Sequence, residues 1–491
     1  MSEQRLHPAA IIFQFIRSLK DIALGLLPVL LFTLRGETLR YAVAGIVILL
    51  LLLLLLAVWR WMRFSYTITG DELHIKQGIF IRKERRISKN RIQSIDLTQS
   101  LIHRLFGLTK VQIETAGSDE NVDASLAAVV FSEGERVQNE LKADYRMNME
   151  EKEDTSKEYP SETTGYGKLA LAGATSDNAI LIFGLMWLLY SQANQIIPEG
   201  TYEQATAWVL SLALQMIVVI VLSSIVIVWG VGVLWTMVKY AKFTITRYER
   251  ELYMTYGLIE KRQRTIPVHR IQAVIVKENL LRQLFGLCYV YVEVAGGVSN
   301  GKMEGSTVHL LPLLTRQRVP AFLETYLPEY SREEPQLKRP PLRSLPYYVW
   351  KGLFLVLIAV VVVFYVAPSW IMVPVAALPI FIGWGWLCWR TAGIKADDTF
   401  LNLSFRTIGR ETITVKQRRL QAFEKRENWL YRRQHLATID VAILNNTAGR
   451  HFTVSALEEI DVTMASAQFS SVPHIHELQK RNKENAPGDI E

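Results

Sequence analysis

Long apolar runs recur along the chain, and each pair of them is followed by a segment in which apolar and polar residues alternate. One run, AVAGIVILLLLLLLLAVW from Ala42, contains eight consecutive Leu residues and carries no charged residue. A helix needs about 20 apolar residues to cross a bilayer, and this run reaches about that length. We predict six membrane-spanning helices in three close pairs. The other five runs lie at about residues 19–34, 179–195, 207–235, 347–366 and 369–389.

After the apolar pairs, the period of the hydrophobic pattern changes to two. FSYTITGDELHIKQGIF from Phe64 and FTITRYERELYMTYGLI from Phe243 alternate between apolar and polar residues and contain glycine turn signals. A charged strand follows, then a short apolar-faced helix whose glycine stop, Gly107 in the first segment, suits a left-handed conformation. Later strands and a closing helix, such as Arg318–Tyr326, complete each segment. This order predicts a small β-sandwich or barrel closed by a helix.

One phrase occurs twice in the chain and a third time in weaker form. HRLFGLTKVQIETAG begins at His103, and RQLFGLCYVYVEVAG begins at Arg282. The offset of about 180 residues is far longer than a solenoid repeat, so it indicates a duplicated domain. The third copy, ENWLYRRQHLATIDVAIL, starts at Glu427 and has Gln434-His435 where the others have Phe-Gly. The unit is therefore a helical hairpin plus a β-rich domain, three times over.

The order of hairpin, alternating strands, R-I-Q, short helix, L-F-G-L and V-x-V-E-x-A-G resembles the bacterial pleckstrin-homology (PH) domain family. The resemblance covers nearly the whole chain and is strongest in the first two units. It implies three PH-like sandwiches, each closed by a C-terminal helix, in a bacterial plasma membrane. It implies no catalytic residues. It also implies a membrane partner, for which a smaller YdbS-like protein with one unit is the expectation.

These patterns predict a layout of three hairpins, three PH-like domains, two linkers and a tail. The N-terminal segment and first hairpin occupy residues 1–62, the second hairpin 169–241 and the third 346–389. The PH-like domains are expected at 63–145, 242–330 and 390–480. An acidic linker at 146–168, a Pro-rich linker at 331–345 and a polar tail at 481–491 complete the layout.

The distribution of charge predicts the orientation in the membrane. Lys and Arg follow the second run of each pair, as in Arg60 and Arg63, whereas the loops inside the pairs carry fewer. The positive-inside rule then puts both termini and all three domains in the cytoplasm. Two cysteines, Cys288 and Cys388, give no sign of a disulfide framework.

Basic residues cluster before each R-(I/L)-Q position, and the chain has a net charge of +8. No aromatic stacking platform accompanies them, which disfavours nucleic-acid binding. A solvated strand face, attraction to an anionic leaflet and docking of a protein partner all remain open. Near an anionic leaflet each Lys or Arg gains about 1 kcal/mol. The candidate docking residues are Lys83, Arg85, Arg86, Lys89, Lys261, Arg262, Arg264, Arg410, Lys416 and Arg418.

Two further sets of residues recur at equivalent positions of the repeats. We expect the recurring Arg to pin a loop carbonyl or carboxylate within its unit, because a guanidinium donates in a fixed fork. We expect the Leu-Phe pairs of the short helices to be core or interdomain contacts. The first set is Arg91, Gln93, Arg270, Gln272, Arg419 and Gln421. The second is Leu105, Phe106, Leu284 and Phe285.

No metal, nucleotide-phosphate or dinucleotide motif occurs, so we expect no cofactor and no enzymatic activity. No ionisable residue lies in the middle of an apolar run, which disfavours transport of ions or polar solutes. We therefore expect a multi-pass membrane scaffold for leaflet or partner docking, with a role in envelope stress or antimicrobial tolerance. A lipid or peptide transporter is the alternative. The ligand, the partner's stoichiometry and the oligomeric state are left open by the sequence.

Overall fold

The chain forms two compact units whose boundary falls inside the second repeat. The computed structural model describes residues 3–33, 39–79, 81–115, 124–150, 159–176, 214–295, 307–331, 336–366, 368–444 and 449–470. Unit 1 comprises Met1–Glu162, Lys242–Pro267 and Gly296–Gly305. Unit 2 comprises Thr163–Ala241, Val268–Ala295 and Ser306–Glu491. The compact units are thus not the sequence repeats themselves.

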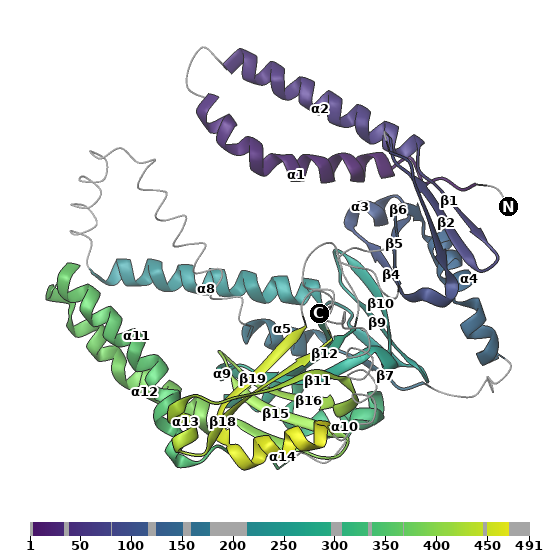
Figure 1. Cartoon of the computed structure of the whole chain (residues 1–491). Helices are drawn as coiled ribbons and strands as arrows, with labels where there is room; N and C mark the ends of the chain where they lie inside the picture. Colours follow the sequence, from purple (N-terminus) through teal and green to yellow (C-terminus); the bar gives the residue numbers. More distant parts are fainter. Residues whose placement is uncertain are drawn as a thin grey trace, which may run out of the picture. The chain divides into compact units, whose positions relative to one another are not determined.

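Three helices among the described residues are long and apolar enough to cross a membrane: Ala44–Met62, Leu342–Val366 and Pro368–Thr391. The first lies within α2 (Leu39–Met62), and the other two contain α11 (Leu345–Val366) and α12 (Met372–Thr391). They confirm three predicted spans. α11 packs against α12, as Figure 1 shows.

The other predicted spans do not reach that standard within the described residues. α1 (Ala10–Thr33) includes Arg17, Lys20 and Asp21 and pairs with α2. In α8 (Leu214–Lys239), the apolar stretch Val226–Lys239 is shorter than a membrane span. α8 packs on α5 (Tyr166–Ala174). The run predicted at 179–195 lies outside the described residues.

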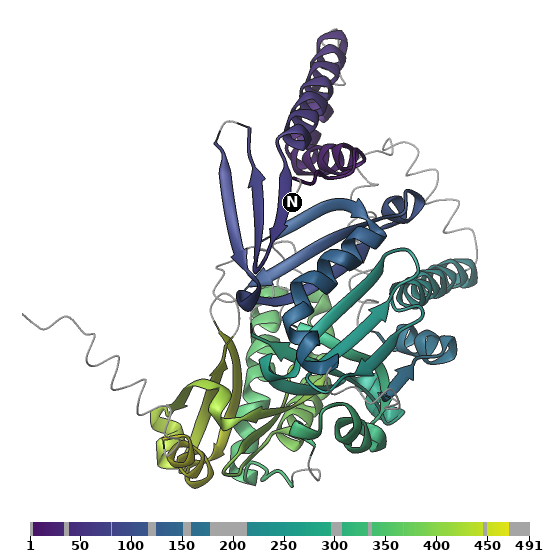
Figure 2. The same ribbon diagram turned by 90° about the vertical axis from the view of Figure 1, so that its right-hand side faces the viewer.

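Unit 1 contains the complete sandwich of the first repeat. One sheet has the order β1-β2-β3, and its strands stand beside the hairpin helices in Figure 2. The facing strands are β4, β5 and β6, and α4 closes the sandwich. Leu73 and Ile75 from the first sheet pack with Ile95, Ile113 and Val137 in one buried core. The bounds are β1 Ser65–Thr69, β2 Glu72–Gln77, β3 Lys83–Ser88, β4 Ile92–Gln99, β5 Leu108–Thr115, β6 Ala124–Val130 and α4 Phe131–Glu150.

The second sheet of unit 1 is shared between two repeats. β4 of the first repeat pairs with β10 of the second, which gives the order β6-β5-β4-β10-β9-β8-β7. Alternating burial along β8 and β9 fits the period-two pattern seen in the sequence. The added strands are β7 Ser161–Thr163, β8 Thr244–Arg247, β9 Glu251–Tyr256 and β10 Lys261–Pro267.

Unit 2 repeats this arrangement one step later along the chain. Its shared sheet has the order β13-β12-β11-β16-β15-β14, so β11 of the second repeat pairs with β16 of the third. The bounds are β11 Ile271–Glu278, β12 Leu287–Val294, β13 Thr307–Thr315, β14 Gly393–Ala396, β15 Phe400–Arg406 and β16 Arg410–Lys416.

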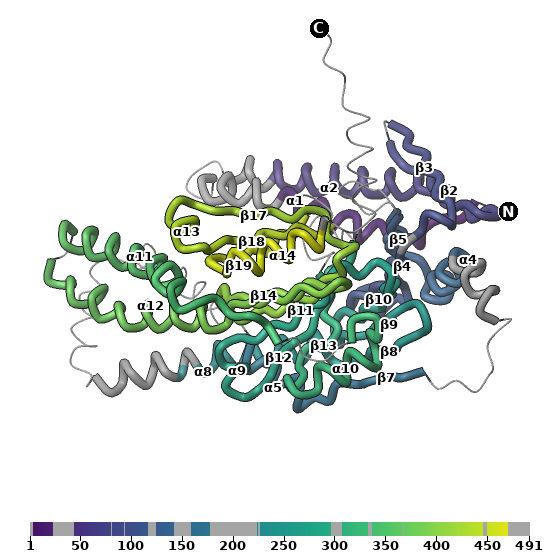
Figure 3. Tube along the Cα trace, turned by 60° about the horizontal axis from the view of Figure 1, so that its bottom comes forward, coloured from purple at the N-terminus to yellow at the C-terminus, as the bar shows by residue number. Residues whose placement is uncertain are grey.

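The third repeat ends in a separate sheet of order β17-β18-β19, against which α14 packs (Figure 3). Leu403 and Ile413 of the shared sheet join Ile439, Val454 and Val462 in one core, which completes the third sandwich. The bounds are β17 Leu420–Arg426, β18 Leu436–Ile443, β19 Arg450–Glu458 and α14 Glu459–Ser470.

Both shared sheets use the same register. In unit 1, Gln99 of β4 lies opposite Lys261 of β10. In unit 2, Glu278 of β11 lies opposite Arg410 of β16. Gln99 and Glu278 occupy one repeat position, one residue before the cap of the short helix, and Lys261 and Arg410 both begin their strands. One mode of strand pairing thus joins consecutive repeats twice.

The predicted linkers are partly structured at their ends. α4 runs to Glu150, past the boundary predicted at residue 145, and α5 begins at Tyr166. In the Pro-rich linker, Lys338 forms an antiparallel bridge with Ile394, so this segment extends the β14 edge. The closing helix predicted for the second repeat is confirmed as α10 (Val319–Tyr326).

Candidate membrane-contact site

A five-residue helix follows the fourth strand of every repeat: α3 (Leu101–Leu105), α9 (Leu280–Leu284) and α13 (Trp429–Arg433). Polar caps precede them, and the Ser100 hydroxyl and the Asn428 side chain accept from backbone N–H groups. After the helix the chain turns through a left-handed residue, which is Gly107 (φ 63°) in the first repeat. The predicted glycine stop is therefore confirmed. In the third repeat His435 adopts the same conformation (φ 52°), which a side chain makes unfavourable.

The apolar side chains of these helices face outward, so they do not belong to the core of their domains, and that alternative of the prediction was wrong. Leu105 is 81% exposed, Phe106 50%, Leu284 80% and Phe285 66%. The core is filled instead by the strand that follows, in which Leu108 is fully buried. The pattern misled because a five-residue helix has only one face toward the domain, and another residue occupies that face.

The inward-facing position is held by His103, Arg282 and Tyr431, which are repeat equivalents of different chemical type. Each contacts a helix at the base of the hairpin of its own repeat, which is α1, α5 or α11. Because the residue type changes at every copy, comparison of the repeats gave no signal for it, and sequence reasoning missed this position.

His103 is buried and stacks on Phe13 of α1, with ring centroids 3.8 Å apart. Its Nε2 lies 2.9 Å from the Ala127 carbonyl, to which only an N–H can donate, and its Nδ1 lies 2.7 Å from the Ser100 hydroxyl. These contacts satisfy the neutral ring. Burial lowers the pKa of His103, and the charge of Lys110 acts in the same direction.

Arg282 performs the same task in the second repeat. Its Nη2 donates to the Ala172 carbonyl (2.9 Å) and its Nε to the Thr175 hydroxyl (3.0 Å), both in or next to α5. Its Nη1 also donates to the Pro312 carbonyl of β13 (3.5 Å), the strand equivalent to the one that holds Ala127. The guanidinium thus ties α9 both to the hairpin and to its own domain.

Tyr431 completes the set in the third repeat. Its ring packs edge-on against Tyr347 of α11, with centroids 4.9 Å apart. Arg343, just before α11, donates to the Gln434 carbonyl at the end of α13 (3.0 Å). In all three repeats, therefore, the short helix is attached to the base of a hairpin.

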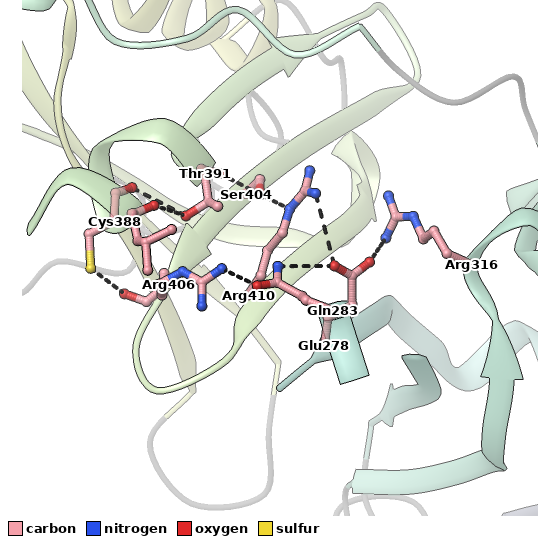
Figure 4. A network of polar contacts seen from close by, with 9 residues as sticks. Glu278, Gln283, Arg316, Cys388, Thr391, Ser404, Arg406 and Arg410 are labelled. Atoms are coloured by element: carbon pink, nitrogen blue, oxygen red, sulfur yellow. Dashed lines mark hydrogen bonds and ion pairs between the residues drawn. The ribbon is translucent and has the colours of Figure 1, made fainter. Parts of the chain in front are cut away.

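A second contact links α9 to the end of a membrane-spanning helix. Arg406, at the end of β15, donates through Nη2 to the Gln283 side chain of α9 (2.6 Å), and its guanidinium lies 5.8 Å from the Trp384 ring of α12. Cys388 of α12 contacts the Arg406 carbonyl, and Thr391 accepts from Ser404 through its carbonyl (Figure 4). α9 therefore lies level with the end of the α12 span.

Turns between strands add apolar side chains next to the short helices. Arg104 of α3 donates to the carbonyl of Leu258 (2.5 Å), in the turn between β9 and β10, where Leu258 and Ile259 are 46% and 41% exposed. In unit 2 the equivalent turn carries Ile408, which is 59% exposed. In each shared sheet, a short helix and a turn between two strands thus lie together at the end nearest the membrane helices of that unit.

Within each unit, the predicted docking cations lie in different environments. In the shared sheets they pair with acids: Arg264 with Asp96 (3.2 Å), Arg262 with Glu260 (3.3 Å) and Arg410 with Glu278 (4.0 Å). Lys261 is exposed at the start of β10. Lys83, Arg85 and Arg86 are exposed on β3, an edge strand.

Three of these cations lie far from the membrane helices. Lys89, whose N–H donates to the Asp71 carbonyl, sits at the end of β3 opposite the hairpin. Lys416, 4.5 Å from the Tyr330 ring centroid, and Arg418 sit at the corresponding end in the third repeat. A strand of six residues spans about 20 Å, which exceeds the Debye length of about 8 Å at physiological salt. Leaflet docking by these three residues stays a prediction.

The recurring Arg ends the short turn between the two sheets of each repeat, and the recurring Gln is the second residue of the strand that follows. Arg419 donates to the carbonyl of His269, so it holds a loop carbonyl of the preceding repeat and not of its own unit. Arg270 and Gln272 are buried, and Gln272 donates to the Arg270 carbonyl (2.9 Å). Arg91 and Gln421 are exposed, whereas the Gln93 side chain lies outside the described residues.

Comparison with known proteins agrees with the three-unit architecture. The sequence model of the family described as "Bacterial PH domain" matches residues 21–145, 206–329 and 341–486. The chain is 30% identical over 488 residues to the UPF0699 transmembrane protein YdbT of Bacillus subtilis (strain 168), an alignment that covers 96% of this chain and 99% of the relative. No solved structure matches the chain. On the three family matches and this full-length similarity, the chain belongs to the bacterial PH domain family.

Proposed function

We propose that the protein is a non-enzymatic multi-pass scaffold of the bacterial plasma membrane. Its PH domains lie on the cytoplasmic face, with the short helices in the headgroup region and other surfaces left for docking partners. One observation carries the proposal: a single repeat position attaches an apolar short helix to the base of the hairpin in all three repeats. His103, Arg282 and Tyr431 hold that position.

The energetics favour placing these side chains in lipid. Full transfer of a Leu or Phe side chain out of water contributes about 1.5–3 kcal/mol. Leu105, Phe106, Leu284 and Phe285 are at least half exposed, so most of that gain is unused within the folded domains. Trp429 of α13, 73% exposed, adds an aromatic ring of the kind enriched at membrane interfaces. Nearby cations such as Lys261 are suited to contact anionic headgroups.

A depth measurement tests the proposal in the full-length protein. An environment-sensitive fluorophore is attached to a cysteine at Leu105 or Leu284 in nanodiscs that contain lipids with a quencher near the headgroup. Matched controls carry it at Asp71 or Asp398, exposed turn residues one strand away from the spans. We expect quenching at the first pair of sites and none at the second. Equal quenching at all four sites would refute the placement.

The cytoplasmic orientation has its own test. In intact cells, an impermeant thiol reagent is expected to label a cysteine at Glu199, between the two apolar runs predicted as the second hairpin, and to spare one at Asp71. The opposite pattern would reverse the topology. The motivation is the bias of Lys and Arg toward the segments after the second apolar run of each pair.

The biological part of the proposal is support of the envelope against membrane-active agents, together with a one-unit membrane partner. A deletion strain is expected to be more sensitive to cationic antimicrobial peptides, and a variant with Leu105→Ser and Leu284→Ser to complement it poorly. Purification from native membranes should recover a stoichiometric partner. Movement of lipid or peptide by the purified protein in liposomes would instead favour the transporter.

A further inference from the structure

Two strands of the chain are equivalent to strands that join repeats, yet lie at the edges of their own sheets. β3 is the repeat equivalent of β10 and β16, and it is the last strand in the order β1-β2-β3. β17 is the equivalent of β4 and β11, and it is the first strand in the order β17-β18-β19. Within the described part of the chain, no strand pairs with the outer side of either.

The two edges are complementary in kind. Inside the chain a β4-type strand pairs antiparallel with a β10-type strand twice, in one register. The first repeat presents the β10-type edge and the last repeat presents the β4-type edge. Exposed strand edges carry unpaired backbone donors and acceptors, and natural proteins cover or protect them. The last repeat of one copy therefore has a free edge, β17, of the type that pairs with β3 in the first repeat of another copy.

The side chains on the two edges match in the register already used. That register pairs Gln263 with Leu97, and one residue further along it Asp96 and Arg264 form an ion pair of 3.2 Å. Transferred to β17 and β3, the same position brings Glu424 opposite Arg85. The next position along brings Lys425 opposite Glu84. Both pairs have opposite charge, which stabilises cross-strand neighbours.

One position opposes the association. The same register sets Arg426 opposite Lys83, a like-charge pair that weakens the contact. Glu424 and Arg426 now pair with each other (2.7 Å), and Arg426 also approaches Asp440 (3.1 Å). The contact therefore exchanges local ion pairs for cross-strand ones, with new backbone hydrogen bonds along six to seven residues.

We propose that copies of this chain associate head to tail, with β17 of one copy paired antiparallel to β3 of the next. This contact would extend the repeat-to-repeat pairing from within the chain to between chains. It is heterologous, so it closes into a ring or continues as an open array. The inference rests on the proposed location of all repeats on one side of the bilayer.

Cross-linking between two differently tagged copies tests the pairing directly. One full-length copy carries Glu424→Cys and the other Arg85→Cys, both in a background without Cys288 and Cys388. Residues directly opposite in antiparallel strands have Cα atoms about 4.5–5.5 Å apart, within the range a disulfide spans. We expect a mixed-tag disulfide in native membranes. As a matched control, His451→Cys on β19 replaces Glu424→Cys, and we expect no cross-link.

Charge reversal tests the register. In nanodiscs or detergent, Arg85→Glu and Glu424→Arg are each expected to weaken self-association by about fivefold, and the double variant to restore it. Lys83→Glu is expected to strengthen it, because it removes the like-charge pair with Arg426. Failure of the double variant to restore association would refute the register even if a cross-link formed.

Several outcomes would overturn the proposal. One is a disulfide that forms when a single chain carries both Glu424→Cys and Arg85→Cys but not between two differently tagged copies. Another is association of these edges with a one-unit PH-domain protein and not with a second copy. A third is loss of binding to anionic vesicles in Arg85→Glu with self-association unchanged, which would assign β3 to the leaflet. Fluorophore quenching at Leu105 and Leu284 is unaffected by all three, so failure here is distinguishable from failure of the membrane-contact proposal.

Discussion

Alanine substitutions at Leu105 and Leu108 separate a lipid-facing side chain from a core one. The two leucines lie three residues apart, on either side of the Gly107 turn. Leu105 is 81% exposed, whereas Leu108 is fully buried at the start of β5. The same change of side chain therefore acts in two opposite environments within one turn of chain.

The expected magnitudes differ by several kcal/mol. Leu108→Ala removes buried methyl groups and leaves a cavity, which costs about 2–5 kcal/mol. Leu105→Ala removes little buried surface, and exposed substitutions change the free energy of unfolding by about 0.5 kcal/mol or less. Since each 1.4 kcal/mol is tenfold in population, Leu108→Ala should raise the open population of unit 1 by at least about 25-fold.

Limited proteolysis of the full-length protein in detergent measures that population when opening is fast relative to cleavage. Fragments are assigned by mass spectrometry, so that cuts inside residues 64–145 are counted separately. We expect rapid cutting there in Leu108→Ala and a wild-type rate in Leu105→Ala. In unit 2, Leu284→Ala and the buried Val290→Ala form the matched pair. If Leu105→Ala were cut as fast as Leu108→Ala, α3 would be a core element and the membrane-contact site would be refuted.

Three further predictions concern contacts that position the repeats. Asp96→Asn should destabilise the shared sheet of unit 1 by about 1.5–3 kcal/mol, and in a thermal-melting cycle Arg264→Gln should add less than its separate effect. The pKa of His103 is lowered in the fold, so the unfolded chain takes up its proton first. The free energy of unfolding of unit 1 should then fall as pH drops below about 6.5, by at most about 1.4 kcal/mol per pH unit. Limited proteolysis measures this fall, and His103→Gln should abolish it. At the left-handed residue that ends the short helix, Gly286→Ala should lower the free energy of unfolding by about 1–2 kcal/mol. His435→Gly should raise the melting temperature; a lower melting temperature would mean that the His435 contact with Glu459 outweighs the backbone strain.

Local features were predictable from the sequence because they depend on neighbours along the chain. The Leu-rich run before Trp59 specifies a membrane helix by length and polarity alone. The alternation from Phe64 specifies strands, and Gly107 specifies a left-handed helix end, since a residue without Cβ takes that conformation at little cost. The repeated R-I-Q and L-F-G-L phrases revealed three units because the copies share an ancestor's local constraints.

The partners of those elements were decided only in the tertiary structure. Pairing of β4 with β10 uses backbone groups that every residue has, so no side-chain pattern announces that a sheet is shared between repeats. The outward face of Leu105 could not be told from an inward one, because an apolar side chain suits a protein core and a lipid interface equally. The anchoring position of His103, Arg282 and Tyr431 was hidden for a related reason: stacking, hydrogen bonding and edge-on packing perform one task with three different side chains.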